Sequence, residues 1–165
     1  MAQFKTLSYV IGACQPEDDD QRALWLRRVR HWRTLGKVLP SAPDAFRGEG
    51  RLRRYNEETI PLIAVLLRSA DHHSPDELDA ISRLIEQNLA RRLPFARHWR
   101  TATASAGTGT DPNIYLTVAY PGPARNEFAV RCGPSPVFLA DDLDVYVIHL
   151  TSIFGILNVL NKEDA

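Results

Sequence analysis

Cysteine is nearly absent from this chain of 165 residues, which contains only Cys14 and Cys132. The two cysteines lie far apart and belong to no motif with metal-ligand spacing, so no zinc site or disulfide framework is indicated. We therefore expect a reduced compartment and two buried, inert thiols. A redox switch between the two cysteines is the alternative.

Signatures of catalysis are missing as well. The sequence contains no nucleophile elbow, no glycine loop for phosphates and no paired carboxylates of the kind that glycosidases use. His72 and His73 are neighbours whose side chains point in different directions, and no further histidine or cysteine accompanies them, which disfavours a metal site. We expect a protein that is not an enzyme and that needs no cofactor or metal.

Targeting signals are equally scarce. The first ten residues lack the basic start and long apolar core of a secretory signal. The strongly apolar stretch 143–160 approaches the length of a membrane span, but it contains His149, Thr151, Ser152 and Asn158 and follows Asp141 and Asp142. We therefore expect no membrane association and a cytoplasmic location.

The net charge is zero, but charge is distributed unevenly. Residues 21–54 contain ten basic side chains and only two acidic ones, whereas residues 101–165 contain three basic and seven acidic ones. A cationic block beside an anionic block indicates one part that binds a polyanion and another part with a different task.

Residues 21–35 predict an amphipathic helix. Trp25, Val29 and Trp32 form one apolar stripe, so both tryptophans are expected in the core rather than in base stacking. The acidic run 17–20 suits the positive end of the helix dipole, and Gly36 suits a left-handed residue that ends the helix. The opposite side of the helix is mainly basic: Arg27, Arg30, His31 and Thr34.

A proline- and glycine-rich loop over 40–50 and the basic segment 51–55 predict a hairpin with a flexible tip. Asn56 is placed to cap a buried helix that runs to about residue 70, although Pro61 requires a kink or a second cap at Thr59. Ser74 and Glu77 form a capping box around Pro75, and this box starts a further helix that ends near residue 91.

The remaining third of the chain predicts a linker over 92–113 and strands over 114–120 and 127–132, with 137–140 as a candidate third strand. A helix is expected over 143–160, and its acidic first turn would explain the aspartates at 141, 142 and 144. A strand followed by a helix is the alternative for this stretch. The apolar seam of the expected helix is a candidate dimerisation surface: Leu143, Tyr146, Leu150, Ile153, Leu157 and Leu160.

These elements predict an α+β fold that is mainly α. Three regions are expected: a winged helix-turn-helix domain over 1–91, a linker over 92–113, and a strand-strand-helix dimerisation region over 114–165.

The first region resembles the MerR family. Val29-Arg30-His31-Trp32 followed by Gly36 is similar to the family pattern of an apolar residue, an arginine, two aromatic-type residues and a closing glycine. The segment 50–58 resembles the family's wing strand and the cap of its next helix. The segment 74–84 resembles its fourth helix, so the resemblance covers about residues 8–90.

The resemblance implies that double-helical DNA is bound, with Arg30 and His31 on phosphates and with Arg54 and Tyr55 holding the wing on the backbone. Base edges would be read among Arg22, Arg27 and Arg30. For Tyr55 the alternative is a packed residue, and for the arginines it is a solvated surface. The full set of candidate DNA-binding residues is Arg22, Arg27, Arg30, His31, Arg51, Arg53, Arg54 and Tyr55.

Two features depart from the family pattern. The segment 16–20 replaces the tight turn before the reading helix, and its carboxylates would repel phosphates. Either this run points away from DNA or the helix begins earlier. The tail lacks the family's long dimerisation helix, so no effector or metal sensing is transferred from the resemblance.

The sequence thus predicts a sequence-specific, nucleoid-associated transcription regulator that acts as a homodimer. Two alternatives remain open: an excisionase-like or architectural DNA-binding protein in recombination, and a protein-interaction module without a DNA role.

Overall fold

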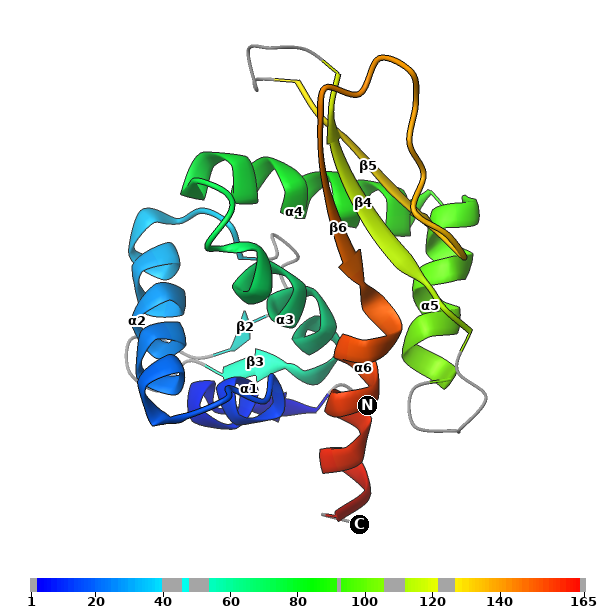
Figure 1. Cartoon of the computed structure of the whole chain (residues 1–165). Coiled ribbons are helices and arrows are strands. Elements are labelled where there is room, and N and C mark those ends of the chain that lie inside the picture. Colours follow the sequence, from blue (N-terminus) through cyan, green and yellow to red (C-terminus); the bar gives the residue numbers. More distant parts are fainter. Residues whose placement is uncertain are drawn as a thin grey trace. The chain divides into compact units, whose positions relative to one another are not determined.

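The fold was analysed in a computed structural model, which describes residues 3–39, 46–47, 54–91, 93–105, 112–121 and 127–163; for 46–47 and 158–163 it describes the backbone only. The chain forms two compact units, Met1–Arg83 and Leu84–Glu163, and the boundary falls within a helix. Helices and two small sheets make up these units (Figure 1), which confirms the predicted α+β class with mainly helical content.

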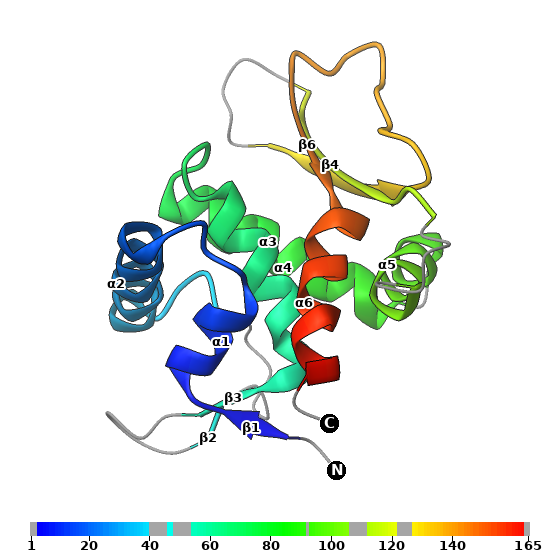
Figure 2. The ribbon, with the colours of Figure 1, turned by 60° about the horizontal axis from the view of Figure 1, so that its bottom comes forward.

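The N-terminal unit combines helices with a small antiparallel sheet in the order β1-β3-β2 (Figure 2). Its strands are β1 (Phe4–Lys5), β2 (Phe46–Arg47) and β3 (Arg54–Asn56). Its helices are α1 (Leu7–Ala13), α2 (Asp19–Leu35), the short 3₁₀ helix η3 (Glu57–Thr59), α3 (Ile60–Ser69) and the first half of α4 (Pro75–Ala90).

Local capping defines both ends of α2. The Asp18 carboxylate accepts a 2.7 Å hydrogen bond from the backbone N–H of Gln21, so the helix begins two residues before the predicted start. At the other end Gly36 has φ 64°, as predicted, and its N–H and that of Lys37 donate to the last carbonyls of the helix. The acidic run therefore stabilises the start of α2.

The next two helices follow their predictions in different degrees. Asn56 caps the short helix η3 through the N–H of Glu58 rather than α3 itself, and α3 begins at Ile60 with Pro61 in its first turn; Thr59, the predicted second cap, makes no side-chain cap bond. Ser74 and Glu77 form the predicted reciprocal box at the start of α4, with bonds of 2.7 and 3.3 Å.

The core of the N-terminal unit lies around α3, in which eight of ten residues are buried. The apolar stripe of α2, formed by Trp25, Val29 and Trp32, is also buried, as predicted. Arg68 of α3 donates to the carbonyls of Cys14 and Gln15 at the end of α1, and its guanidinium lies 5.5 Å from the centre of the Trp25 ring. This one side chain therefore joins α1, α2 and α3.

The C-terminal unit contains the second half of α4, an antiparallel sheet in the order β5-β4-β6 and two further helices. The strands are β4 (Tyr115–Tyr120), β5 (Ala129–Gly133) and β6 (Asp144–His149), and the helices are α5 (Pro94–Ser105) and α6 (Leu150–Glu163). Trp99 of α5 packs edge-on against Phe154 of α6, with ring centres 5.1 Å apart. The two helices thus share an aromatic core.

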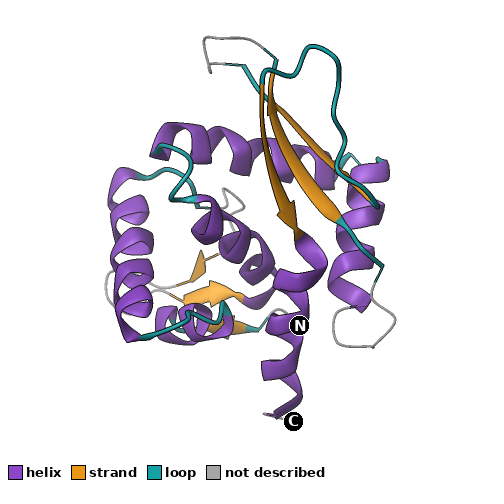
Figure 3. Cartoon of the chain, in the orientation of Figure 1, coloured by secondary structure: helices purple, strands orange, loops and turns teal. Residues whose placement is uncertain are grey.

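The predicted linker over 92–113 is wrong for residues 94–105, which form α5 (Figure 3). Phe95, Ala96, Trp99 and Ala102 recur at spacings of one, three and three residues and are all buried. The small residues after Thr101 disguised this helix, because its apolar face is carried mainly by its first half.

The predicted helix over 143–160 is also corrected. Residues 144–149 form β6, the central strand β4 pairs with it residue by residue, and only Leu150–Glu163 is helical. The alternative of a strand followed by a helix is therefore confirmed. The candidate strand over 137–140 is not a strand.

The predicted dimerisation seam is divided by this correction. Leu143 precedes β6 and Tyr146 lies on it, whereas Leu150, Ile153 and Leu157 of α6 are buried within their own chain. The side chain of Leu160 lies outside the described residues. Because most of the helical part of the seam is already covered, α6 does not offer the predicted surface to a second chain.

Candidate nucleic-acid interface

The exposed side of α2 carries three of the candidate DNA-binding residues. Arg27, Arg30 and His31 are all exposed and lie opposite the buried tryptophan stripe. At about 100° per residue, Arg30 and His31 lie within about 60° of Arg27 around the helix axis. They therefore form one basic face. Thr34 continues it, with its hydroxyl bonded to the Arg30 carbonyl.

Arg22 is exposed but does not belong to this face. It lies five positions before Arg27, which places it about 140° away around the helix. A duplex centred on Arg27 and Arg30 would therefore meet Arg22 only at its margin. Of the predicted base readers, Arg27 and Arg30 are brought together and Arg22 is not.

Ion pairs distinguish two groups of cations near α2. Arg28 pairs with Asp71 at 2.5 Å and Lys37 pairs with Asp76 at 2.6 Å, so these two charges have carboxylate partners. For Arg22, Arg27 and Arg30 the structure records no ion pair with a described residue. The basic face thus keeps its charge available for a polyanion, whereas the flank of the helix is neutralised.

The acidic run lies at one end of this face. Asp20 is seven residues before Arg27, so both lie on the same line along α2, and Asp20 is exposed. Of the two arrangements expected for the acidic run, the structure shows that the helix begins earlier. A duplex on the basic face would therefore be repelled at the N-terminal end and attracted around Arg27, Arg30 and His31.

The predicted hairpin is present at its base. β2 and β3 pair antiparallel, with Phe46 opposite Tyr55 and Arg47 opposite Arg54. Arg54 is exposed, whereas Arg51 and Arg53 lie outside the described residues. The two described strands are therefore those of an antiparallel hairpin.

Tyr55, a candidate DNA-binding residue, does not lie on the surface of the protein. Its side chain is fully buried, so it cannot contact a phosphate, and the alternative of a packed residue holds. Tyr55 lies between β1 and β2 in the small sheet, opposite Lys5 and Phe46. Its buried ring is therefore part of the hydrophobic core.

The segment that joins α2 to the wing contains an unusual residue that sequence analysis missed. Val38 is fully buried and has φ 72°, a conformation that β-branched residues rarely adopt. Its N–H donates to the Asp79 carboxylate of α4 at 2.7 Å. Lys37 beside it pairs with Asp76, and this contact raises the pKa of Lys37. Two carboxylates of α4 thus hold the two residues that follow the C-cap of α2.

Of the two thiols, that of Cys14 is buried, as predicted, whereas Cys132 is half-buried. Burial raises the pKa of Cys14 to about 12, and burial raises that of Cys132 to about 12 as well. Within the described ranges no group of three or more histidine, cysteine or acidic residues is arranged to hold a metal ion. None of the described helices combines the length and the apolar character that crossing a membrane requires.

Comparisons with known proteins return no match: no family model, no curated protein and no solved structure matches the chain. The likeness to the MerR family therefore depends on the motifs of this sequence, and it stays a prediction.

Proposed function

We propose that this protein is a sequence-specific, double-stranded DNA-binding transcription regulator of MerR-like type. The observation that carries the proposal is the basic face of α2, where Arg27, Arg30 and His31 are exposed and no ion pair with a described residue neutralises the arginines. An α-helix fits the major groove, where arginine bonds bidentately to guanine.

The order of elements around α2 supports the same proposal. α2 follows the short helix α1 and precedes the antiparallel strands β2 and β3, which is the order of a helix-turn-helix with a wing. In that arrangement α2 enters the major groove, and Arg54 at the base of the hairpin contacts the backbone. Arg51 and Arg53 would extend this contact.

Action as a homodimer is part of the proposal, because regulators of this kind bind two half-sites related by a twofold axis. The buried α6 does not offer the surface for it. Another surface of the C-terminal unit is considered in the next subsection.

The experiment has two steps. Selection from random duplexes identifies the preferred site, and fluorescence anisotropy then measures affinity for that site at several salt concentrations. We expect log Kd to change linearly with log salt, because phosphate contacts release counterions. Replacing Arg30 with alanine should weaken binding and lower the salt slope by about one.

Two variants make the test specific. Arg97→Ala with Arg100→Ala removes two exposed arginines from α5, and this matched control should leave binding unchanged. Asp20→Asn removes a carboxylate on the line of Arg27 and should strengthen binding, a gain that misfolding cannot produce.

The outcomes separate the alternatives. A selected palindrome supports regulation, whereas clustered sites that bend on binding support an architectural role in recombination. No binding to any duplex at low salt would contradict both and leave a protein-interaction module. Equal loss in the α2 variant and the α5 control would overturn the assignment of the surface.

A further inference from the structure

β6 is an edge strand of the C-terminal sheet, because the order β5-β4-β6 gives it a partner on one side only. Its six residues include Val145, Tyr146, Val147 and Ile148, an uncharged run between Asp144 and His149. Proteins usually protect such edges, since an open apolar edge can pair with another strand.

The direction of the backbone groups in β6 follows from its register. Leu150 donates its N–H to the carbonyl of Ile114. Because hydrogen-bonded pairs alternate along an antiparallel ladder, the N–H and C=O groups of residues 148, 146 and 144 also point toward β4. The N–H and C=O groups of Val145 and Val147 therefore point away from β4. For these groups the structure records no hydrogen bond with another described residue.

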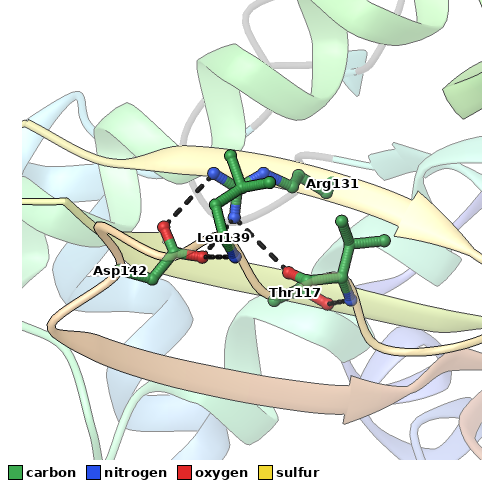
Figure 4. Close-up of polar contacts among 5 residues, drawn as sticks. Thr117, Arg131, Leu139 and Asp142 are labelled. Atoms are coloured by element: carbon green, nitrogen blue, oxygen red, sulfur yellow. Dashed lines mark hydrogen bonds and ion pairs between the residues drawn. The ribbon is translucent and has the colours of Figure 1, made fainter.

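A strap over residues 134–143 crosses one face of this sheet and is fixed by polar contacts (Figure 4). Arg131 of β5 forms two bonds with the Asp142 carboxylate, at 2.8 and 3.3 Å, and the Asp142 side chain is only 1% exposed. The same carboxylate accepts the N–H of Leu139, while Val137 donates its N–H to the Thr117 hydroxyl of β4. The strap is thus bonded to the sheet through Asp142 and Val137, and the bond between Leu139 and Asp142 lies within the strap itself.

Although the strap is anchored, its large apolar side chains are not covered. Phe138 is 60% exposed, Leu139 51% and Leu143 67%, and Val147 on the edge strand is 37% exposed. Val147 lies opposite Thr117, the residue to which the strap is bonded, so the strap and the edge belong to one side of the sheet. A fixed loop that exposes such residues beside an open strand is typical of an interaction surface.

We infer that β6 pairs antiparallel with β6 of a second copy of this chain, forming a continuous six-stranded sheet. The outward groups of Val145 and Val147 would bond to those of Val147 and Val145 in the partner, and Tyr146 would face its own copy across the twofold axis. Antiparallel pairing of one strand with itself is isologous, so one patch satisfies both subunits.

The chemistry of the strand favours a second copy over an unrelated peptide. In this register each apolar valine on the strap side lies beside a valine of the partner, and Asp144 lies opposite Ile148 rather than opposite another carboxylate. Leu143 would lie beside His149, which stacks on Tyr115 with ring centres 4.7 Å apart. The surface therefore complements itself without charge repulsion.

The first test measures the oligomeric state of the full chain by light scattering across a wide range of concentration. We expect a dimer, and we expect Val147→Pro to give a monomer, because proline removes an outward N–H without touching the bonds to β4. The matched control Val147→Thr keeps the N–H and the branched shape and should remain dimeric. Circular dichroism checks that each variant is folded.

The second test fixes the register. Tyr146 would face its copy in a non-hydrogen-bonded pair, where Cα atoms are about 4.5 Å apart, so Tyr146→Cys should form an intermolecular disulfide under mild oxidation. Val147→Cys lies opposite residue 145 and should not. The unmodified chain is the background control, since it measures any cross-linking through Cys14 or Cys132.

A monomer at every concentration, or a dimer unaffected in folded Val147→Pro, would overturn the inference. Efficient cross-linking of Val147→Cys but not of Tyr146→Cys would overturn the register. None of these readouts involves DNA, so the dimer inference and the proposed DNA binding can fail separately.

Discussion

The Oδ1 atom of Asp79 accepts a 2.7 Å hydrogen bond from the backbone N–H of Val38, and this bond holds a valine in a left-handed conformation. Such a conformation costs about 1–2 kcal/mol for a residue with a side chain. The valine is nevertheless fully buried, and Leu39 donates back to the carbonyl of Lys37 at 2.9 Å. Burial and Asp79 together keep the chain in this turn between the proposed reading helix and the wing.

Replacing Asp79 with alanine should therefore destabilise the fold by about 1–2 kcal/mol, because a buried N–H loses its acceptor. Asp79→Asn keeps an acceptor oxygen and should cost less. Asp76→Ala is the matched control. The Asp76 side chain, which pairs with Lys37, is 81% exposed, so we expect the free energy of unfolding to change by no more than about 0.5 kcal/mol. Urea denaturation measures all three, and equal losses at 79 and 76 would contradict this account.

The same substitution should have opposite effects at two glycines. Gly36 has φ 64°, so Gly36→Ala should destabilise by about 1 kcal/mol, although an added Cβ would meet no atom within 4 Å. Gly155 lies within α6 and also has free space around a Cβ. Gly155→Ala should therefore stabilise by about 0.5–1 kcal/mol. Thermal unfolding followed by circular dichroism tests the difference in sign.

The strap should be sensitive to acid. The Arg131 guanidinium, and then the N–H of Leu139, hold the pKa of Asp142 below its usual value. Because this pKa is lowered in the folded state, the stabilisation is fully present above the unfolded value, about 3.9, and is lost as the pH falls from there through the folded pKa.

We therefore expect Asp142→Asn to lower Tm at neutral pH, and we expect the Tm difference from the unmodified chain to shrink below about pH 4. Calorimetry over a series of pH values measures this difference. A constant difference down to strongly acidic pH would show that ionisation of Asp142 does not stabilise the strap.

The two thiols should be unreactive in the folded protein. With the pKa of Cys14 and Cys132 raised to about 12 by burial, almost no thiolate exists near neutral pH. A chromogenic disulfide reagent should therefore modify neither cysteine until denaturant is added, after which both react. Rapid reaction of one thiol under native conditions would contradict its burial.

Sequence analysis predicted the elements of the N-terminal unit well, because local chemistry determines them. Asp18, Gly36, Asn56 and the Ser74–Glu77 box define helix ends by hydrogen bonds that span a few residues. The tryptophan stripe of α2 likewise specifies its buried side through spacing alone.

The C-terminal unit was predicted less well, because tertiary pairing determines it. The stretch from Leu143 to Leu157 matches the spacing of a helical seam, yet Val145 and Val147 also alternate as a strand, and only pairing with β4 decides between the two. Sequence reasoning likewise had no means of bringing Arg131 to Asp142, eleven residues later, or Val38 to Asp79.

Of the residues predicted to bind DNA, some lie on the exposed surface and Tyr55 does not. The position of Arg27, Arg30 and His31 on one exposed face follows from helical periodicity and was predictable. Burial of Tyr55 was only the alternative, because a residue that directly follows Arg53 and Arg54 shows its role only when the pairing of β3 with β1 and β2 is known.

The three tryptophans are divided between the two units, and this has a practical consequence. Trp25 and Trp32 are buried in Met1–Arg83, whereas Trp99 is buried against Phe154 in Leu84–Glu163. Each half of the chain therefore carries its own fluorophore. Replacing Trp99 with phenylalanine leaves tryptophan emission from the first half alone. Comparison of its melting curve with that of the unmodified chain then shows the order in which the halves melt, without any added dye.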